Sequence, residues 1–338
     1  MSDLATSLEI GTVKLPNRIF LAPMSGVSDL PFRIRAQAHG AGLVVSEMIA
    51  SEEFCKARRE SRQRANCDGL AVRMLQLAGR EAEWMDEAAR IAEADGADII
   101  DINMGCPAKK VTGGYSGSAL MRDLDHAMTL IAATVNAVNV PVTLKMRLGW
   151  DEESVNAPEL ARRAVDAGVR MITVHGRTRM QLYNGRADWD RVAEVREAIS
   201  VPLVVNGDIQ SLDDARRACA ASGADAVMIG RGSYGQPWLP GEIARAAGYR
   251  HEAAPGPSRR ALADYVVAHY EDMLTHYGAE TGVRHARKHL GWYLDRHAAP
   301  APDAHKLRKQ IMTSSQPGEV IRLISHVLAE SPIAAEAA

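Results

Sequence analysis

Asp98-Ile-Ile-Asp-Ile-Asn-Met-Gly-Cys-Pro107 opens with a short apolar run that ends at Asn103. The run predicts a buried β-strand that ends in an amide, and a glycine, a thiol and a proline follow as a turn. Ligands bind at the carboxyl ends of strands in parallel α/β proteins. Asn103 and Cys106 are therefore candidate site residues. The alternative is an ordinary turn with an inert thiol, and the other strands decide between the two.

Seven further β-branched runs alternate with helical patterns, which predicts parallel βαβ units. The predicted strands are Arg18–Ala22, Gly42–Ser46, Ala71–Gln76, Asp98–Asn103, Pro141–Lys145, Met171–His175, Pro202–Asn206 and Asp225–Gly230. The predicted helices between them include Glu81–Asp95, Leu124–Val138, Pro158–Ala167, Asp188–Ala198 and Leu212–Ser222. Eight near-regular periods predict a closed (β/α)8 TIM barrel. The longest interval follows Asn103, so extra residues are expected in the loop that holds Cys106.

The chain is longer than such a barrel, because it has 338 residues and a barrel needs about 250. We predict a barrel over residues 1–248, a linker over 249–257, a small all-α domain over 258–330 and a disordered tail over 331–338. The helical patterns in the second domain are Arg259–Tyr277, Gly282–Arg296, Ala304–Gln310 and Glu319–Leu328. Four basic residues there predict a face that could bind a polyanion, although a solvated helix face is the alternative. They are Arg284, Arg287, Lys288 and Arg296.

The overall composition is that of an ordinary soluble globular protein, with 46% hydrophobic residues and a net charge of −2. That charge excludes no class of partner, so any nucleic-acid site depends on local basic patches. The cysteines at 55, 67, 106 and 219 have no metal-ligand spacing, which favours free thiols without a metal. We expect a cytoplasmic protein that does not associate with membranes, because the start is polar and no apolar run approaches the length of a span.

Polar residues gather at the predicted strand ends. A lysine that ends an apolar strand, Lys145, is costly to bury unless a ligand oxygen or a carboxylate faces it. Gly207 and Gly230-Arg231 follow strands seven and eight, where barrels often bind phosphate. Gly230-Arg-Gly-Ser-Tyr-Gly235 matches a dinucleotide fingerprint, but no strand with a terminal acid follows it. We therefore interpret it as a phosphate loop.

From about Gly11 to Arg296 the chain resembles the tRNA-dihydrouridine synthases, and most strongly their bacterial B class. The matching motifs are Asn17-Arg18, Ala22–Asp29, Ser46–Met48, Gln76, Asp101–Val111, Gly117–Leu120, Val140–Arg147, His175–Thr178, Asn206–Asp208, Met228–Arg231 and Arg287–His289. The chain departs from the B-class pattern at Thr112–Ser116, where the family usually has a more basic stretch. That departure could weaken RNA contacts near the site.

The resemblance implies an enzyme whose barrel binds FMN and whose helical domain helps to bind tRNA. The residues that would contact FMN are Pro23, Met24, Ser25, Gln76, Lys145, His175, Asn206, Gly207, Asp208, Gly230 and Arg231. Cys106 corresponds to the catalytic acid, and Asn103 and Arg177 would face the target uracil. The candidate tRNA contacts are Lys109, Lys110, Arg284, Arg287, Lys288 and Arg296.

The implied reaction reduces the C5–C6 double bond of a tRNA uridine to 5,6-dihydrouridine, with NADPH as the reductant of FMN. Our hypothesis is that FMN N5 delivers a hydride to C6 while Cys106 delivers a proton to C5. The uridine must be turned out of its stack to react. The B-class resemblance suggests position 17 in the D-loop, and we expect a monomer.

Three alternatives stay open. An FMN oxidoreductase could act on a free pyrimidine, as dihydroorotate and dihydropyrimidine dehydrogenases do, but the basic helical domain favours a polymeric substrate. A non-catalytic RNA-binding protein would have no need of Cys106 and Lys145. A uridine in ribosomal RNA could be the target instead of one in tRNA.

Overall fold

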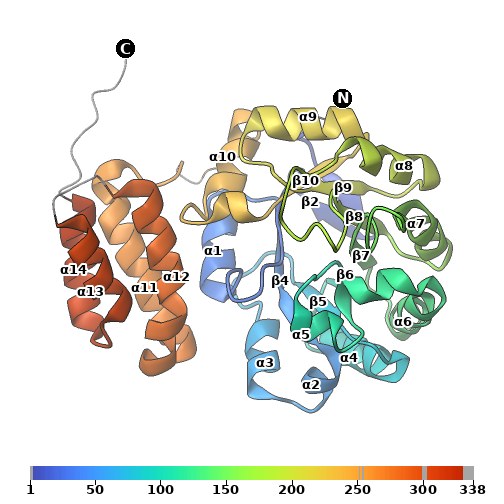
Figure 1. Cartoon of the computed structure of the whole chain (residues 1–338), viewed down its shortest axis with the longest axis horizontal. Coiled ribbons are helices and arrows are strands. Elements are labelled where there is room, and N and C mark those ends of the chain that lie inside the picture. The colour runs from blue at the N-terminus through green and yellow to red at the C-terminus, as the bar shows by residue number, and fades with distance from the viewer. Residues whose placement is uncertain (1–2, 251, 253–254, 299–302, 330–338) are drawn as a thin grey trace.

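Eight parallel strands form a closed barrel in the order β10-β3-β4-β5-β6-β7-β8-β9. The computed structural model describes residues 3–250, 252, 255–298 and 303–329. Figure 1 shows helices around the barrel and a helical domain at one side of it. The strands are β3 (Ile19–Leu21), β4 (Leu43–Ala50), β5 (Met74–Ala78), β6 (Ile99–Met104), β7 (Val142–Arg147), β8 (Met171–His175), β9 (Leu203–Asn206) and β10 (Ala226–Ile229). The predicted TIM barrel is confirmed.

The strands form because most of their residues are apolar and nearly all are buried, as a barrel between a packed interior and a helical shell requires. Phe20, Val45 and Ile99 belong to one buried cluster with Leu8 and Ile10. These last two come from an antiparallel hairpin of β1 (Leu8–Ile10) and β2 (Val13–Leu15), which precedes the barrel. The hairpin therefore packs against residues near the amino ends of the barrel strands, and it was not predicted from the sequence.

The helices of the barrel lie within two residues of their predicted bounds where a prediction was made. They are α1 (Leu30–Ala38), α4 (Ala82–Ala94), α6 (Leu124–Ala137), α7 (Ala157–Asp166), α8 (Asp190–Ala198), α9 (Leu212–Ser222) and α10 (Leu239–Ala246). Two short helices between β4 and β5 were not predicted, α2 (Ser51–Cys55) and α3 (Arg59–Ala65). The long interval after β6 holds α5 (Lys109–Thr112) and a 3-10 helix (Gly117–Arg122), so the expected insertion lies beside Cys106.

The helical domain consists of α11 (Leu262–Tyr277), α12 (Ala279–His297), α13 (Ala304–Thr313) and α14 (Pro317–Ala329), after a 3-10 turn at Arg259–Ala261. Its buried cluster includes Trp238, which precedes α10 in the barrel part of the chain. Packing thus crosses the predicted boundary at residue 248. The predicted tail 331–338 and part of the predicted linker lie outside the described residues. No helix in the described part of the chain is long and apolar enough to cross a membrane.

Candidate active site

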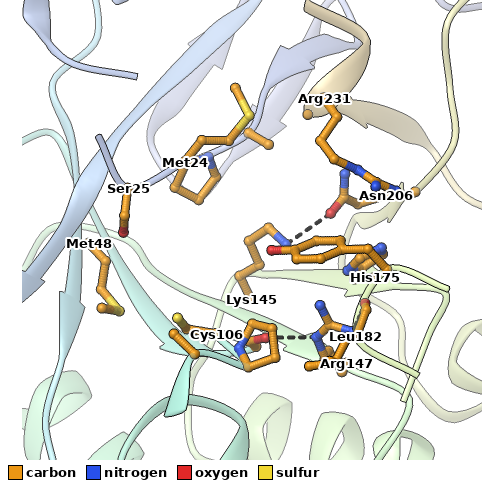
Figure 2. A pocket seen from close by; sticks show the side chains of 18 of the residues that line it. Met24, Ser25, Met48, Cys106, Lys145, Arg147, His175, Leu182, Asn206 and Arg231 are labelled. Carbon is orange, nitrogen blue, oxygen red and sulfur yellow. Dashed lines mark hydrogen bonds between the residues drawn. The ribbon is translucent and has the colours of Figure 1, made fainter. Parts of the chain in front are cut away.

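A cavity of about 940 Å³ opens at the carboxyl ends of the barrel strands (Figure 2). It brings together sixteen of the residues that the sequence marked as site residues. They are Pro23, Met24, Ser25, Gln76, Asn103, Cys106, Lys109, Lys110, Lys145, His175, Asn206, Gly207, Asp208, Gly230, Arg231 and Arg296. They come from seven strand ends and from the helical domain, so residues far apart in the sequence share one site.

Lys145 is buried in the wall of this cavity near the end of β7. Its Nζ donates a hydrogen bond to Oδ1 of Asn206 at 3.0 Å, which Figure 2 marks with a dashed line. Burial lowers the pKa of Lys145 to about 8, and the nearby Asp101 carboxylate opposes this shift. The hydrogen-bond partner is a neutral amide, so the ammonium lacks a directly bonded counter-ion. A buried cation in this state is suited to an anionic or electron-rich ligand.

Gln76 and Asn103 form a buried chain of hydrogen bonds that reaches Cys106. The Gln76 amide donates to Asp101 Oδ2 at 2.6 Å and accepts from Asn103 Nδ2 at 2.7 Å. Asn103 Oδ1 in turn accepts from the backbone N–H groups of Gly105 at 3.2 Å and Cys106 at 3.0 Å. The Asn103 side chain thus shapes the turn that presents the thiol, a use that the sequence did not indicate.

His175 is a neutral imidazole in this site. Burial and the neighbouring cations Arg147, Lys145 and Arg177 hold the pKa of His175 well below its usual value. An arginine can only donate, so the 3.4 Å contact from Arg177 Nη1 makes His175 Nε2 the acceptor. The proton of the ring is therefore on Nδ1.

Arg177 does not line the cavity, which corrects the expectation that it faces the target base. It is 1% exposed and forms a 2.6 Å ion pair with Asp208. It also donates to the carbonyl oxygens of Asn184 at 3.0 Å and Gly185 at 2.8 Å. The Arg177 guanidinium therefore has a positioning role, because its ion pair and hydrogen bonds connect the loop after β8 to the loop after β9.

Arg147 lines the cavity, although it was not predicted as a site residue. It donates to the carbonyl oxygens of Gly105 at 2.8 Å and Leu182 at 2.9 Å, so it joins the turn of Cys106 to the loop after β8. Burial lowers its pKa to about 10. A sequence signal was available, because side chains two apart on a strand share a face and Lys145 already pointed inward.

The loops after β9 and β10 form the side of the cavity that the sequence marked as a phosphate site. Gly207 has a φ of +122°, and a Cβ there would lie 2.6 Å from the Ala187 side chain. Only glycine allows the backbone of this loop to pass so close. Arg231 is 46% exposed on its side chain and lies over the Tyr183 ring at 4.6 Å, with Asp208 at 3.5 Å. These loops offer main-chain groups and one accessible guanidinium to an anion.

The predicted basic residues separate into two groups. Lys109 and Lys110 on α5 and Arg296 on α12 are exposed and line the cavity. Three others do not line it: Arg284 is exposed and pairs with Glu280, whereas Arg287 and Lys288 are half-buried. Arg287 donates to the carbonyl oxygen of Thr313 at 3.4 Å. The predicted basic face of the helical domain is therefore partly directed inward.

Solved structures with the same barrel support this reading of the fold. An old yellow enzyme homologue from Zymomonas mobilis aligns with a TM-score of 0.51 at 16% identity, covering 75% of this chain and 95% of that chain. A 2-naphthoyl-CoA reductase in complex with 2-naphthoyl-CoA aligns with a TM-score of 0.57 at 13% identity, covering 72% and 52%. Identities this low show a shared fold alone.

The fold and the cavity define a (β/α)8-barrel enzyme with its site at the carboxyl face. The family model described as dihydrouridine synthase matches residues 20–332. The chain belongs to the dihydrouridine synthase family, and it is thus an enzyme of the flavin oxidoreductase class.

Named relatives cover almost the whole chain. A probable tRNA-dihydrouridine synthase of Rhizobium leguminosarum bv. phaseoli is 58% identical, over 92% of this chain and 95% of the relative. The tRNA-dihydrouridine synthase B of Xanthomonas axonopodis pv. citri is 46% identical, over 87% and 89%. The resemblance to the B class seen in the motifs is confirmed.

Proposed function

We propose that this chain reduces the C5–C6 double bond of a tRNA uridine to 5,6-dihydrouridine, with FMN as bound cofactor and NADPH as reductant. The observation that carries the proposal is a thiol, Cys106, in one cavity with the buried amine of Lys145 and a phosphate loop. Membership of the family and the names of the relatives supply the substrate.

The residues that line the cavity support FMN as the cofactor. Gly207, Gly230 and Arg231 would hold the phosphate, since their loops expose main-chain groups and a guanidinium. Pro23, Met24 and Ser25 would line the flavin ring. Gln76, Lys145, His175, Asn206 and Asp208 complete the proposed contacts. Lys145 fits particularly well, because reduced flavin can be anionic and the ammonium is free of a bonded carboxylate. Bound FMN, once reduced by NADPH, would supply the hydride that goes to C6.

Cys106 would donate the proton that goes to C5. This transfer leaves a thiolate, and the charges of Lys145 and Arg147 both act on Cys106. Both cations line the same cavity as Cys106, where they would oppose the negative charge that the proton transfer leaves behind. The Asn103 amide and the Arg147 guanidinium hold the turn in place, through Cys106 N–H and the Gly105 carbonyl respectively. One uridine, one NADPH and one proton therefore yield one dihydrouridine and one NADP⁺.

A uridine must leave its stack to reach this thiol, because the cavity lies inside the barrel mouth. Lys109 and Lys110 would contact the RNA phosphates at the rim, and Arg296 would do so from the helical domain. Arg284, Arg287 and Lys288 are further candidates. The resemblance to the B class suggests a D-loop uridine, and position 17 is our specific proposal.

The first experiment is to reduce the flavin anaerobically with NADPH, add tRNA that lacks dihydrouridine and follow reoxidation. We expect rapid reoxidation with dihydrouridine in the tRNA, which also allows the modified position to be mapped. Turnover of a free pyrimidine without any reaction of tRNA would identify a small-molecule oxidoreductase instead. A protein that takes up no FMN would contradict the cofactor assignment.

The Cys106→Ala variant tests whether Cys106 donates the proton to C5. We expect the variant to bind FMN and to accept electrons from NADPH at the wild-type rate, while dihydrouridine formation falls about 100-fold or more, as loss of a general acid entails. Cys55→Ala is the matched control, because Cys55 is a half-buried thiol on α2 outside the cavity. Product formation by Cys106→Ala at the wild-type rate would show that another group donates the proton.

A further inference from the structure

Helix α12 of the helical domain contacts two of the loops that line the cavity. These loops follow β3 and β10, which are hydrogen-bonded neighbours in the barrel. The loop after β3 carries Met24, Ser25 and Gly26, and the loop after β10 carries Gly230, Arg231 and Tyr234. A helix that is placed against both loops can influence how each of them meets a bound cofactor.

On the β10 side, α12 contacts Tyr234 and Gly235, the last two residues of the phosphate loop. The Trp292 and Tyr234 rings stack with centroids 3.9 Å apart and planes 17° apart. Arg296 Nε donates to the Tyr234 carbonyl at 3.0 Å, and His297 Nε2 donates to the Gly235 carbonyl at 2.8 Å. Gly235 has a φ of +67°, and a Cβ there would lie 2.5 Å from the Trp292 carbonyl oxygen. The backbone at Gly235 is therefore in close contact with the backbone of α12 at Trp292.

On the β3 side, α12 reaches Gly26. His289 is 2% exposed and is hydrogen-bonded to the Gly26 backbone. The Gly26 N–H donates to the buried carboxylate of Glu47. A Cβ at Gly26 would overlap the Lys288 ammonium, so Lys288 covers this loop. This contact explains why Lys288 is half-buried.

Several contacts fix the helical domain against the barrel. Arg35 of α1 forms a 2.7 Å ion pair with Asp272 of α11, and the Tyr277 hydroxyl donates to Asp29 at 3.1 Å. Aromatic side chains also pack across the boundary between the barrel and the helical domain. Trp238 of the barrel packs in the core of the helical domain, and Trp292 of α12 packs against the barrel core. These contacts hold α12 in one place relative to the barrel mouth.

We propose that α12 is part of the cofactor site, and that Trp292 is a positioning residue that sets FMN affinity through Tyr234 and the phosphate loop. This inference rests on the proposed use of FMN. It assigns the helical domain a second task beside RNA binding. The domain holds the loops after β3 and β10 in the form that receives the flavin.

Titration of the apoprotein with FMN, followed by quenching of flavin fluorescence, tests the proposal. We expect Trp292→Ala to weaken FMN binding roughly threefold to tenfold, the worth of a lost aromatic pair. Trp292→Phe keeps a ring on Tyr234 and should bind within about twofold of wild type. Trp84→Ala is the matched control, because Trp84 is a half-buried tryptophan on α4, a helix outside the cavity.

A folded Trp292→Ala variant that binds FMN as wild type does would overturn the proposal, even if its KM for tRNA rises. His297→Ala is the second variant in case Trp292→Ala does not fold, because it removes one hydrogen bond from a half-buried side chain. It should release FMN a few times faster, and unchanged release would count against α12 in the same way. Wild-type protein that binds no FMN overturns this inference together with the proposed function. Wild-type binding with unaffected variants overturns the inference alone.

Discussion

At the scale of single residues, Lys145 illustrates a conflict between stability and binding. Its pKa falls from 10.5 to about 8 on folding because the ammonium is buried. At 1.36 kcal/mol per pKa unit, the charged form costs the folded apoprotein about 3 kcal/mol below pH 8. Between pH 8 and 10.5 the unfolded chain holds a proton that the folded protein lacks, so stability rises with pH in that window.

Lys145→Met should therefore stabilise the apoprotein at pH 7 by up to about 3 kcal/mol and remove its share of this pH dependence. The same change should weaken FMN binding, because it removes the cation that we propose faces the cofactor. Urea unfolding between pH 7 and 10.5 measures the first effect, and flavin titration measures the second. Lys14→Met, at an exposed position on β2, is the control. Parallel stability curves for wild type and Lys145→Met would show that Lys145 keeps its ordinary pKa.

At the scale of elements, the insertion after β6 places two lysines of α5 at the rim of the cavity. Each phosphate contact by a lysine releases a counterion, so binding weakens as salt increases. If Lys109 and Lys110 bind phosphates, replacing both with alanine should reduce the slope of log affinity against log salt by about 1 to 2. tRNA binding measured over a range of KCl concentrations gives that slope. Lys14→Ala should leave it unchanged, and an unchanged slope in the double variant would place the RNA elsewhere.

At the scale of the whole molecule, the barrel and the helical domain share their packing. Phe32 of α1 is 1% exposed and packs against the His269 and His289 rings of the helical domain, with ring centroids 6.0 and 5.7 Å away. Trp238 lies in the core of that domain. Separation of the two parts would expose these aromatic surfaces to water, which is unfavourable.

We therefore expect calorimetry of the full chain to record one cooperative unfolding transition. Trp238→Ala removes a large buried side chain and should shift that transition as a whole, with a loss of roughly 3 kcal/mol. Cys55→Ala, outside the shared core, should shift it far less. Two transitions, of which Trp238→Ala moves only one, would mean that the parts unfold independently.

The sequence by itself determined the barrel and most of its site. Periodic burial selects strand or helix locally, and strand ends of a parallel barrel must meet at one face. Asn103, Cys106, Lys145 and the glycines of the phosphate loop could therefore be assigned to one cavity before any coordinates.

Only the tertiary structure decided what individual side chains do there. Arg177 is buried and does not line the cavity, whereas Arg147 does line it. The tertiary structure also turned Lys288 toward Gly26 and stacked Trp292 on Tyr234. The physical reason is that a local pattern shows which residues are buried, whereas the partner of a charge or a ring comes from a distant part of the chain. That partner becomes known only when the strands and helices have been packed together.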